Sequence, residues 1–180
     1  MPKNIYWDAC VFHSLFGNEK TVDSCKRIEK AAQDGRVWIY TSAVTFVECA
    51  WLKTEKDPTG NLNKLSAKHE EVIAGYFQRS YIAVINCDRN IAEASRKLLW
   101  QFPLKPKDAI HVASAIAQQV DVLHSFDDDL VRLDGKIAGL KICRPDKDPD
   151  FSAKQKTSEL GLSAPPPKSP PTSIPGVEPA

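Results

Sequence analysis

The chain has 180 residues, of which 42% are hydrophobic and 26% charged, and its formal net charge is +1. This composition is typical of a soluble globular protein, and it excludes a mostly disordered chain and a membrane-embedded one. The near-neutral charge leaves no large basic field for nucleic acid, so any such contact has to come from local patches.

The first predicted element is an apolar strand over Asn4–Ala9 that brings Asp8 to its carboxyl end. The chain reaches this strand without the apolar core and cleavage site of a secretory signal, so we expect a cytoplasmic protein. A short helix through Phe16 follows. Val22–Asp34 carries apolar residues at three- and four-residue steps, which predicts an amphipathic helix ended by Gly35.

A second strand is predicted over Val37–Tyr40, followed by a helix that carries Glu48. Thr41 or Ser42 would be a suitable N-cap, because a hydroxyl oxygen can accept a hydrogen bond from the first turn of the helix. The apolar residues nearest to Glu48 are Val47, Cys49 and Ala50. We therefore expect a mostly buried segment there. The polar stretch Lys53–Asn63 predicts a loop.

An amphipathic helix is predicted over Leu65–Gln78, followed by a third strand at Ile82–Ile85. The apolar face of that helix carries Leu65, Val72, Ile73, Tyr76 and Phe77. Asp88 is placed to cap the next helix. Pro106 fits the first position of another helix, which is apolar over most of its circumference and should be largely buried.

Two further strands are predicted at Asp121–Leu123 and Leu140–Ile142, with a helical turn from Asp127 between them. Alternating strands and helices predict an α/β fold, with a central parallel sheet of four to five strands flanked by helices. We assign this domain to residues 1–146. Residues 147–180 are rich in proline and predict a disordered tail, which could be a linker or a ligand for proline-reading domains.

The five cysteines argue against two kinds of structural site. They are odd in number and contain no Cys-x-x-Cys pair, which speaks against a disulfide framework and against a zinc site. Several fall on apolar stripes, where a reduced cysteine acts as a small hydrophobic residue. The cysteines are Cys10, Cys25, Cys49, Cys87 and Cys143.

Four acidic residues share one local setting, because each lies where a predicted strand ends or the following helix begins. They are Asp8, Glu48, Asp108 and Asp127. Ligands bind outside the carboxyl ends of parallel strands, so one edge of the sheet can collect all four. Carboxylates so close repel one another unless a cation offsets their charge, and Mg²⁺ or Mn²⁺ suits oxygen ligands. Such ions support phosphodiester hydrolysis by an activated water.

Each of these acids also has an ordinary explanation. Asp108 lies near a helix N-terminus, where the macrodipole favours a negative side chain. Asp127 can be an N-cap, and the neighbouring Asp128 and Asp129 can be solvated or capping groups. Asp8 is the least ordinary, because a carboxylate at the end of so apolar a strand needs a partner.

Four short blocks follow one another along the chain. They read IYWDACVF (Ile5–Phe12), TSAVTFVE (Thr41–Glu48), KDAIHVA (Lys107–Ala113) and LHSFD (Leu123–Asp127). Together they resemble the four motif blocks of PIN domains, most closely those of the VapC-type ribonuclease toxins of bacterial toxin–antitoxin pairs. The resemblance extends from Ile5 to about Ile142.

The resemblance implies a PIN-like three-layer fold and a metal-dependent endoribonuclease that forms a homodimer and is neutralised by a small antitoxin. The catalytic residues and Mg²⁺ or Mn²⁺ ligands that it implies are Asp8, Glu48, Asp108 and Asp127. Ser125 matches a position where the family usually has a hydroxyl that supports the last acid. Cys10 stands where Ser or Asn is common, and a thiol is a weaker hydrogen-bond partner, so it supports Asp8 less well.

Other polar residues near these blocks have several interpretations. His111 lies three residues after Asp108 on the same helical face, and it could contact substrate, hold a carboxylate in place or be a packed histidine. His13, His69 and His124 share no metal-ligand spacing, and no role is assigned to them. Six lysines could contact RNA phosphates or form solvated helix faces. They are Lys53, Lys56, Lys64, Lys68, Lys105 and Lys107.

Two other functions stay open at this stage. The chain could be a catalytically degenerate PIN module that binds RNA or a protein partner, an alternative raised by Cys10. It could also be a structure-specific DNA nuclease with a similar sheet. The second alternative is weaker, because the chain is short and lacks additional helical insertions for gripping a duplex.

Overall fold

The computed structural model describes residues 1–17, 21–50 and 67–151. Its centre is a five-stranded sheet in the order β3-β2-β1-β4-β5, in which all neighbouring strands are parallel. The strands are β1 (Lys3–Trp7), β2 (Val37–Ser42), β3 (Ile82–Ile85), β4 (Val122–His124) and β5 (Ile142–Cys143). The predicted α/β fold with a parallel sheet is confirmed.

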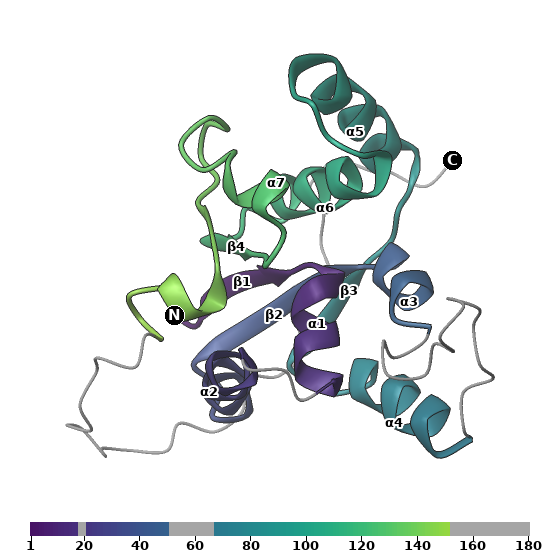
Figure 1. Ribbon diagram of the computed structural model, residues 1–180, viewed down its shortest axis with the longest axis vertical. Coiled ribbons are helices and arrows are strands. Elements are labelled where there is room, and N and C mark those ends of the chain that lie inside the picture. Colours follow the sequence, from purple (N-terminus) through teal and green to yellow (C-terminus); the bar gives the residue numbers. More distant parts are fainter. Residues whose placement is uncertain (18–20, 51–66, 152–180) are drawn as a thin grey trace.

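Helices cover both faces of this sheet and make three layers (Figure 1). One face packs against α1 (Ala9–Phe16), α2 (Val22–Gln33) and α4 (Ala67–Phe77). The other packs against α5 (Arg89–Gln101), α6 (Pro106–Ala117) and α7 (Asp128–Val131). The short helix α3 (Val44–Glu48) follows β2, and the 3-10 helix η2 (Pro145–Lys147) follows β5.

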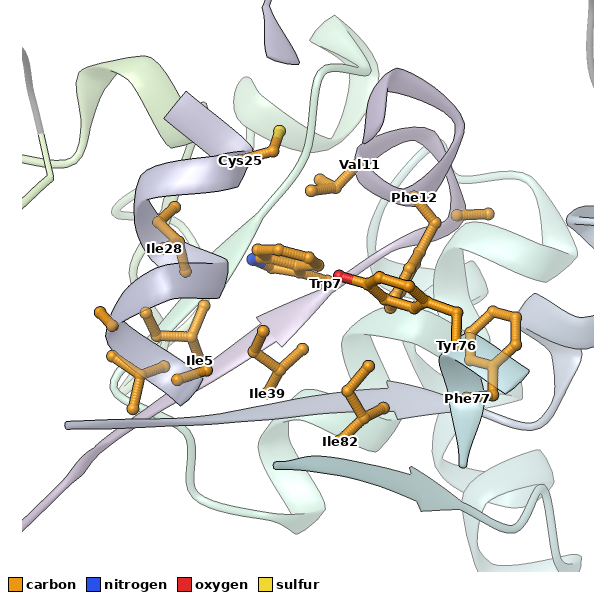
Figure 2. Close-up of a cluster of buried hydrophobic side chains, with 14 of the residues drawn as sticks. Ile5, Trp7, Val11, Phe12, Cys25, Ile28, Ile39, Tyr76, Phe77 and Ile82 are labelled. Atoms are coloured by element: carbon orange, nitrogen blue, oxygen red, sulfur yellow. The ribbon is translucent and has the colours of Figure 1, made fainter. Parts of the chain in front are cut away.

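The two faces carry separate apolar cores, and β1 contributes to both. Ile5 and Trp7 belong to the core under α1, α2 and α4, whereas Tyr6 belongs to the core under α5 and α6. All three side chains are fully buried. Figure 2 shows Trp7 beside Phe12 of α1, with 5.4 Å between the ring centroids. Burial on both faces is typical of a parallel strand between two helical layers.

Two predicted helix starts are confirmed. The Asp88 carboxylate caps α5 by accepting a hydrogen bond from the Ile91 backbone N–H at 2.9 Å. Pro106 occupies the first turn of α6, where its missing N–H would have no helical partner. As predicted, α6 is largely buried, and its buried residues include Asp108 and His111.

The predicted N-cap of α3 is confirmed only in part: the Ser42 Oγ accepts a hydrogen bond from the Val44 backbone N–H at 3.3 Å, but Ser42 lies one residue before the N-cap position. Thr41 and Ser42 belong to β2, and Ala43 occupies the N-cap position without a side-chain hydrogen bond. The Thr41 hydroxyl instead donates to the Trp7 carbonyl oxygen at 2.8 Å. It therefore links β2 to the end of β1, a use of the hydroxyl that depends on the neighbouring strand.

Four of the five strands differ from their predicted bounds by one or two residues. Besides the first and last strands, these are β2, which ends at Ser42 rather than Tyr40, and β4, which is Val122–His124 rather than Asp121–Leu123. The first strand ends at Trp7 rather than Ala9, because Asp8 becomes the N-cap of α1. The last strand is Ile142–Cys143 rather than Leu140–Ile142. These shifts leave the order of the elements unchanged.

Burial around Glu48 was overestimated. Cys49 is buried, but Val47 is 69% exposed and Ala50 is exposed. The prediction failed because α3 is a single short turn that can cover only one side. Val72 was likewise placed on the apolar face of α4, yet it is 55% exposed.

Several predictions concern segments outside the described residues: the loop over Lys53–Asn63, the lysines at positions 53, 56 and 64, Leu65, and the tail from residue 152. The domain boundary at residue 146 stays a prediction. Phe151 packs against the core under α2, and its carbonyl oxygen accepts a hydrogen bond from Arg27. Of the helices in the described ranges, none is long and apolar enough to cross a membrane.

A matched pair of helical isoleucines tests the assignment of the core. Ile28 of α2 is fully buried, whereas Ile116 of α6 is 41% exposed. Ile28→Ala should lower the free energy of unfolding by about 2–5 kcal/mol, because it removes buried methylene groups and leaves a cavity. Ile116→Ala should cost less than about 1 kcal/mol. Urea unfolding measures both values, and equal losses would contradict the assignment.

Candidate active site

The strand order reverses between β1 and β4. Strands β2 and β3 lie on one side of β1, whereas β4 and β5 lie on its other side. Asp8 directly follows β1, and Ser125 directly follows β4. The two strand ends are joined, because the Asp8 backbone N–H donates to the His124 carbonyl oxygen at 3.3 Å. In parallel sheets this switch point is where ligands bind.

Asp8 is a buried carboxylate held at the start of α1. It is 4% exposed, and its Oδ1 accepts hydrogen bonds from the backbone N–H groups of Cys10 and Val11 at 3.0 and 3.3 Å. Burial nevertheless raises the pKa of Asp8, and neither the charge of His111 nor these hydrogen bonds offsets it. The carboxylate thus has too little positive charge around it for its depth in the protein.

Cys10 connects α1 to the loop after β4. Its thiol donates to Asp8 Oδ1 at 2.7 Å, and its sulfur accepts a hydrogen bond from the Phe126 backbone N–H at 2.9 Å. The sulfur also lies 3.5 Å from the Ser125 Oγ. Burial and the neighbouring Asp8 raise the pKa of Cys10 far above its usual range, so the thiol keeps its proton at neutral pH.

Asp127 differs from the two aspartates that follow it. Its backbone N–H donates to the Ser125 Oγ at 2.9 Å, and its Oδ1 caps α7 by accepting from the Asp129 N–H at 2.8 Å. Asp128 instead pairs with Arg144 at 2.6 Å, and Asp129 pairs with Arg132 at 3.0 Å. Asp128 and Asp129 are therefore surface ion-pair partners, and Asp127 lies closest to the strand end.

Asp108, near the start of α6, is the least satisfied of the four acids. It is 4% exposed, and its Oδ2 has no hydrogen-bond partner among the described residues. Burial raises the pKa of Asp108, and repulsion from Asp127 adds to the rise, against the positive charge of Lys107. A buried carboxylate oxygen without a partner is costly unless a cation or water fills the place beside it.

Glu48, in contrast, is fully paired. Its Oε1 accepts from the Lys107 ammonium at 2.7 Å, and its Oε2 lies 2.7 Å from the His111 Nε2. The other ring nitrogen of His111 lies 2.9 Å from the Tyr6 hydroxyl. Burial favours the neutral acid, but the hydrogen bonds from His111 and Lys107 outweigh it and lower the pKa of Glu48 to about 2.

Lys107 shows that these acids share one edge of the sheet. Its pKa is raised by the hydrogen bond to Glu48, and the charges of Asp108 and Asp8 contribute. Asp108 in turn interacts with Asp127. The acids are grouped, but no three of them bring ligand oxygens within 4.8 Å of one another.

Comparisons with known proteins identify the family of the chain. A model of the PIN domain matches residues 5–136, which is most of the chain. The chain belongs to the PIN domain family. The match confirms the resemblance that the four sequence blocks indicated. No curated protein matches the chain.

Solved structures with the same fold include several PIN proteins of toxin–antitoxin pairs. A toxin–antitoxin complex from Klebsiella pneumoniae is 21% identical, with 78% of this chain and 97% of that chain covered and a TM-score of 0.52. The Mycobacterium tuberculosis toxin VapC20, which cleaves the sarcin–ricin loop, is 15% identical, with 69% and 91% covered and a TM-score of 0.53. DNA-bound VapBC from Salmonella typhimurium is 15% identical, with 81% and 99% covered and a TM-score of 0.52. At identities this low, the similarity supports the fold alone.

The donor set of this PIN domain fits a hard divalent cation. Carboxylate oxygens are the ligands that Mg²⁺ and Mn²⁺ prefer, and the unpartnered Oδ2 of Asp108 is a free donor in a buried position. Mg²⁺ usually keeps several of its waters and takes only one or two carboxylates directly. A group of acids of which no three bring their oxygens within 4.8 Å suits such a hydrated ion.

Two features of the site were missed by sequence reasoning. Tyr6 was interpreted only as part of an apolar strand, although a buried tyrosine hydroxyl usually has a polar partner. Its alternation with Ile5 and Trp7 could have shown that it faces α6. Lys107 was considered as a phosphate contact, and its hydrogen bond to Glu48 was not predicted, because the two residues are 59 positions apart.

The lowered pKa of Glu48 predicts an acid-sensitive contribution to stability. A group whose pKa falls from 4.5 to about 2 on folding stabilises the protein fully above about pH 4.5. That contribution is lost as the pH falls through 2. The difference in unfolding free energy between wild type and Glu48→Gln should therefore shrink over this window, as measured by urea unfolding at several pH values.

Glu93→Gln is the matched control for this measurement. Glu93 pairs with Arg89 on the surface of α5, and its side chain is 48% exposed. Exposed pairs of this kind contribute little, so its difference from wild type should stay small throughout the window. A Glu48→Gln difference that is constant from pH 5 to about 2 would contradict the assigned pairing.

Proposed function

We propose that the chain is a metal-dependent endoribonuclease, the toxin of a toxin–antitoxin pair. The observation that carries the proposal is the buried Oδ2 of Asp108, which has no partner in the described ranges, beside Asp127 and near the switch point where Asp8 follows β1. Buried acids at this place lack compensating charge, and a divalent cation would supply it. PIN-family membership supports a nuclease.

Asp8, Asp108 and Asp127 would hold Mg²⁺ or Mn²⁺, and Glu48 would complete the acidic set. Such an ion supplies a water activated as nucleophile and stabilises the charge of the leaving oxygen. The chain's own contribution is to fix these carboxylates: backbone N–H groups of α1 hold Asp8, and Ser125 holds the backbone of Asp127.

The basic residues of α6 would position the RNA. The side chains of Lys105 and Lys107 are 62% and 54% exposed, and both lie within a turn of Asp108. Lysines at such a site contact phosphate oxygens and so orient the backbone without reading its sequence. His111 would keep Glu48 in place through its hydrogen bond, with Tyr6 fixing the ring from the other side.

The proposed antitoxin and homodimer follow from the kind of protein that shares this fold. Several of the similar structures are toxin–antitoxin complexes. An apolar groove between α3 and α4 supports a protein partner, because Phe46, which lines it, is 46% exposed and the next residue in the chain, Val47, is 69% exposed. Exposed apolar surface of this kind often marks an interface. The site of action would be the cytoplasm.

Cleavage of RNA tests the proposal. The purified chain with Mn²⁺ should cut an RNA panel, and a chelator should stop it. Asp127→Asn should lower the rate at least about 100-fold, because it removes a charged ligand. Asparagine is as good an N-cap as aspartate, so α7 should remain intact. Expression of the wild type should slow growth, and expression of Asp127→Asn should not.

Asp128→Asn is the control, since Asp128 pairs with Arg144 on the surface. It should cleave RNA as the wild type does. Equal rates for Asp127→Asn and the wild type would reject the ligand assignment. Cleavage of DNA rather than RNA of the same sequence would favour a DNA nuclease instead.

A degenerate PIN module that binds RNA or a protein is the second candidate, and Cys10 is the observation that favours it. The thiol occupies a hydrogen-bonding position on Asp8, and both carboxylate oxygens of Glu48 already have partners, in Lys107 and His111. A site with these internal partners has less need of a metal ion.

Cys10→Asn separates the two candidates. For an active enzyme, the substitution should change the cleavage rate by less than about tenfold, because it alters a residue that supports a ligand rather than the ligand itself. A large gain from an inactive wild type would favour the degenerate module. Cys87→Asn, at an exposed cysteine, is the control for effects of the substitution alone.

A further inference from the structure

A second cluster of potential ligands lies beside the first, on the same two strands. His124 is the last residue of β4 and Cys143 the last residue of β5, and the two are direct neighbours in the sheet. Asp148 follows η2 and returns to these strand ends. One ligand atom from each of the three residues lies within 4.8 Å of the others.

The cluster is buried and polar. His124 and Asp148 are both fully buried, and the His124 Nε2 lies 2.8 Å from the Asp148 Oδ2. The other ring nitrogen, Nδ1, is buried without a hydrogen-bond partner in the described part of the chain. Burying an imidazole nitrogen without a partner lowers the stability of the fold, unless the nitrogen has another role such as binding a ligand.

We propose that His124, Cys143 and Asp148 bind a thiophilic divalent cation such as Zn²⁺. A set of one imidazole, one thiolate and one carboxylate suits Zn²⁺ or Co²⁺, whereas Mg²⁺ prefers oxygen alone. Three protein ligands leave one tetrahedral position for water, and Cys143 is only partly buried, so solvent has access.

The protonation of the cluster suits this use. Burial lowers the pKa of His124, and this outweighs the nearby Asp148, so the ring is neutral and keeps a lone pair for a metal ion. Although burial opposes it, hydrogen bonds from His124 and the Asp150 backbone keep the pKa of Asp148 well below its usual range. The Cys143 thiol would release its proton to solvent when the metal binds.

Lys3 takes the place of the cation in the metal-free protein. Its ammonium lies 3.2 Å from the Asp148 Oδ2 and 2.6 Å from the Asp150 Oδ2. Because Asp150 is on the surface, Lys3 can keep this second partner when a metal ion takes Asp148. Because Lys3 competes with a metal ion for Asp148, removing its charge should strengthen metal binding.

The three ligands come from different segments, so the cysteine spacing alone gave no indication of them. Metal binding at this cluster does not depend on RNA cleavage by the chain. His124 immediately precedes Ser125, however, so the two sites share the end of β4. An ion here would fix the strand end from which Asp127 follows.

Titration of the full, metal-free chain with Co²⁺ tests the site. One equivalent should produce the thiolate-to-cobalt charge-transfer band and the intense visible bands of a tetrahedral centre. Cys143→Ser should abolish the charge-transfer band, and Asp148→Asn should weaken binding at least about tenfold. Lys3→Met should tighten it at least about tenfold, since a like charge is removed from the metal's side.

Three controls separate this site from the other cysteines and from the acidic site. Cys10→Ala, Cys87→Ala and Asp127→Asn should all retain the band, whatever the outcome of the RNA cleavage assay. A misfolded variant would bind the metal less tightly, so tighter binding by Lys3→Met cannot be an effect of misfolding. An unchanged band in Cys143→Ser would overturn the proposal. The absence of a band in both the wild type and Lys3→Met would also overturn it. The cluster would then be a structural ion pair that joins the two ends of the domain.

Discussion

Strand β1 is enclosed on all sides, and the placement of the candidate site depends on this enclosure. Its edges pair with β2 and β4, and its faces lie in two different cores. Three successive side chains, Ile5, Tyr6 and Trp7, are fully buried, so after Lys3 the next charged group appears only where the strand ends. Asp8 is that group. Because neighbouring parallel strands end at the same edge, the residues after β4 meet it there.

Charge balance divides three of the four acids, Glu48, Asp8 and Asp108, into two kinds. Glu48 is saturated by Lys107 and His111 and is ionised over all ordinary pH values. Burial makes ionisation of Asp8 and Asp108 unfavourable, and few positive groups oppose it. A cation would therefore act mainly on the second kind. Glu48 would help by holding Lys107 close to the same edge.

Residues on either side of the end of β4 belong to two candidate metal sites with different donor atoms, although they are only a few positions apart. His124 lies in register with Trp7 and turns toward the side of Cys143 and Asp148, where nitrogen, sulfur and oxygen donors meet. Ser125 and Asp127 turn to the carboxylate edge, where the donors are oxygen. Because β4 ends at His124, the residues that follow leave the sheet and can serve a different environment.

Local patterns were sufficient for the order of strands and helices, for the cap at Asp88 and for the helix start at Pro106. Each of these depends on residues a few positions apart. The shared setting of the four acids was also visible, because parallel strands bring their carboxyl ends together. One failure came where a distant segment decides the outcome, because Thr41 bonds to Trp7 instead of capping a helix. Another came from the length of an element, since α3 is a single turn that leaves Val47 exposed.

The partners of each acid could come only from the folded chain. Glu48 and Lys107 are 59 residues apart, Tyr6 and His111 are 105 apart, and Cys10 and Ser125 are 115 apart. No periodicity links positions so far apart, and the depth of burial that makes Asp108 costly depends on the packing around it. Residue types and their spacing indicated which side chains could bind a cation. Packing determined which of them are already satisfied and which still lack a partner.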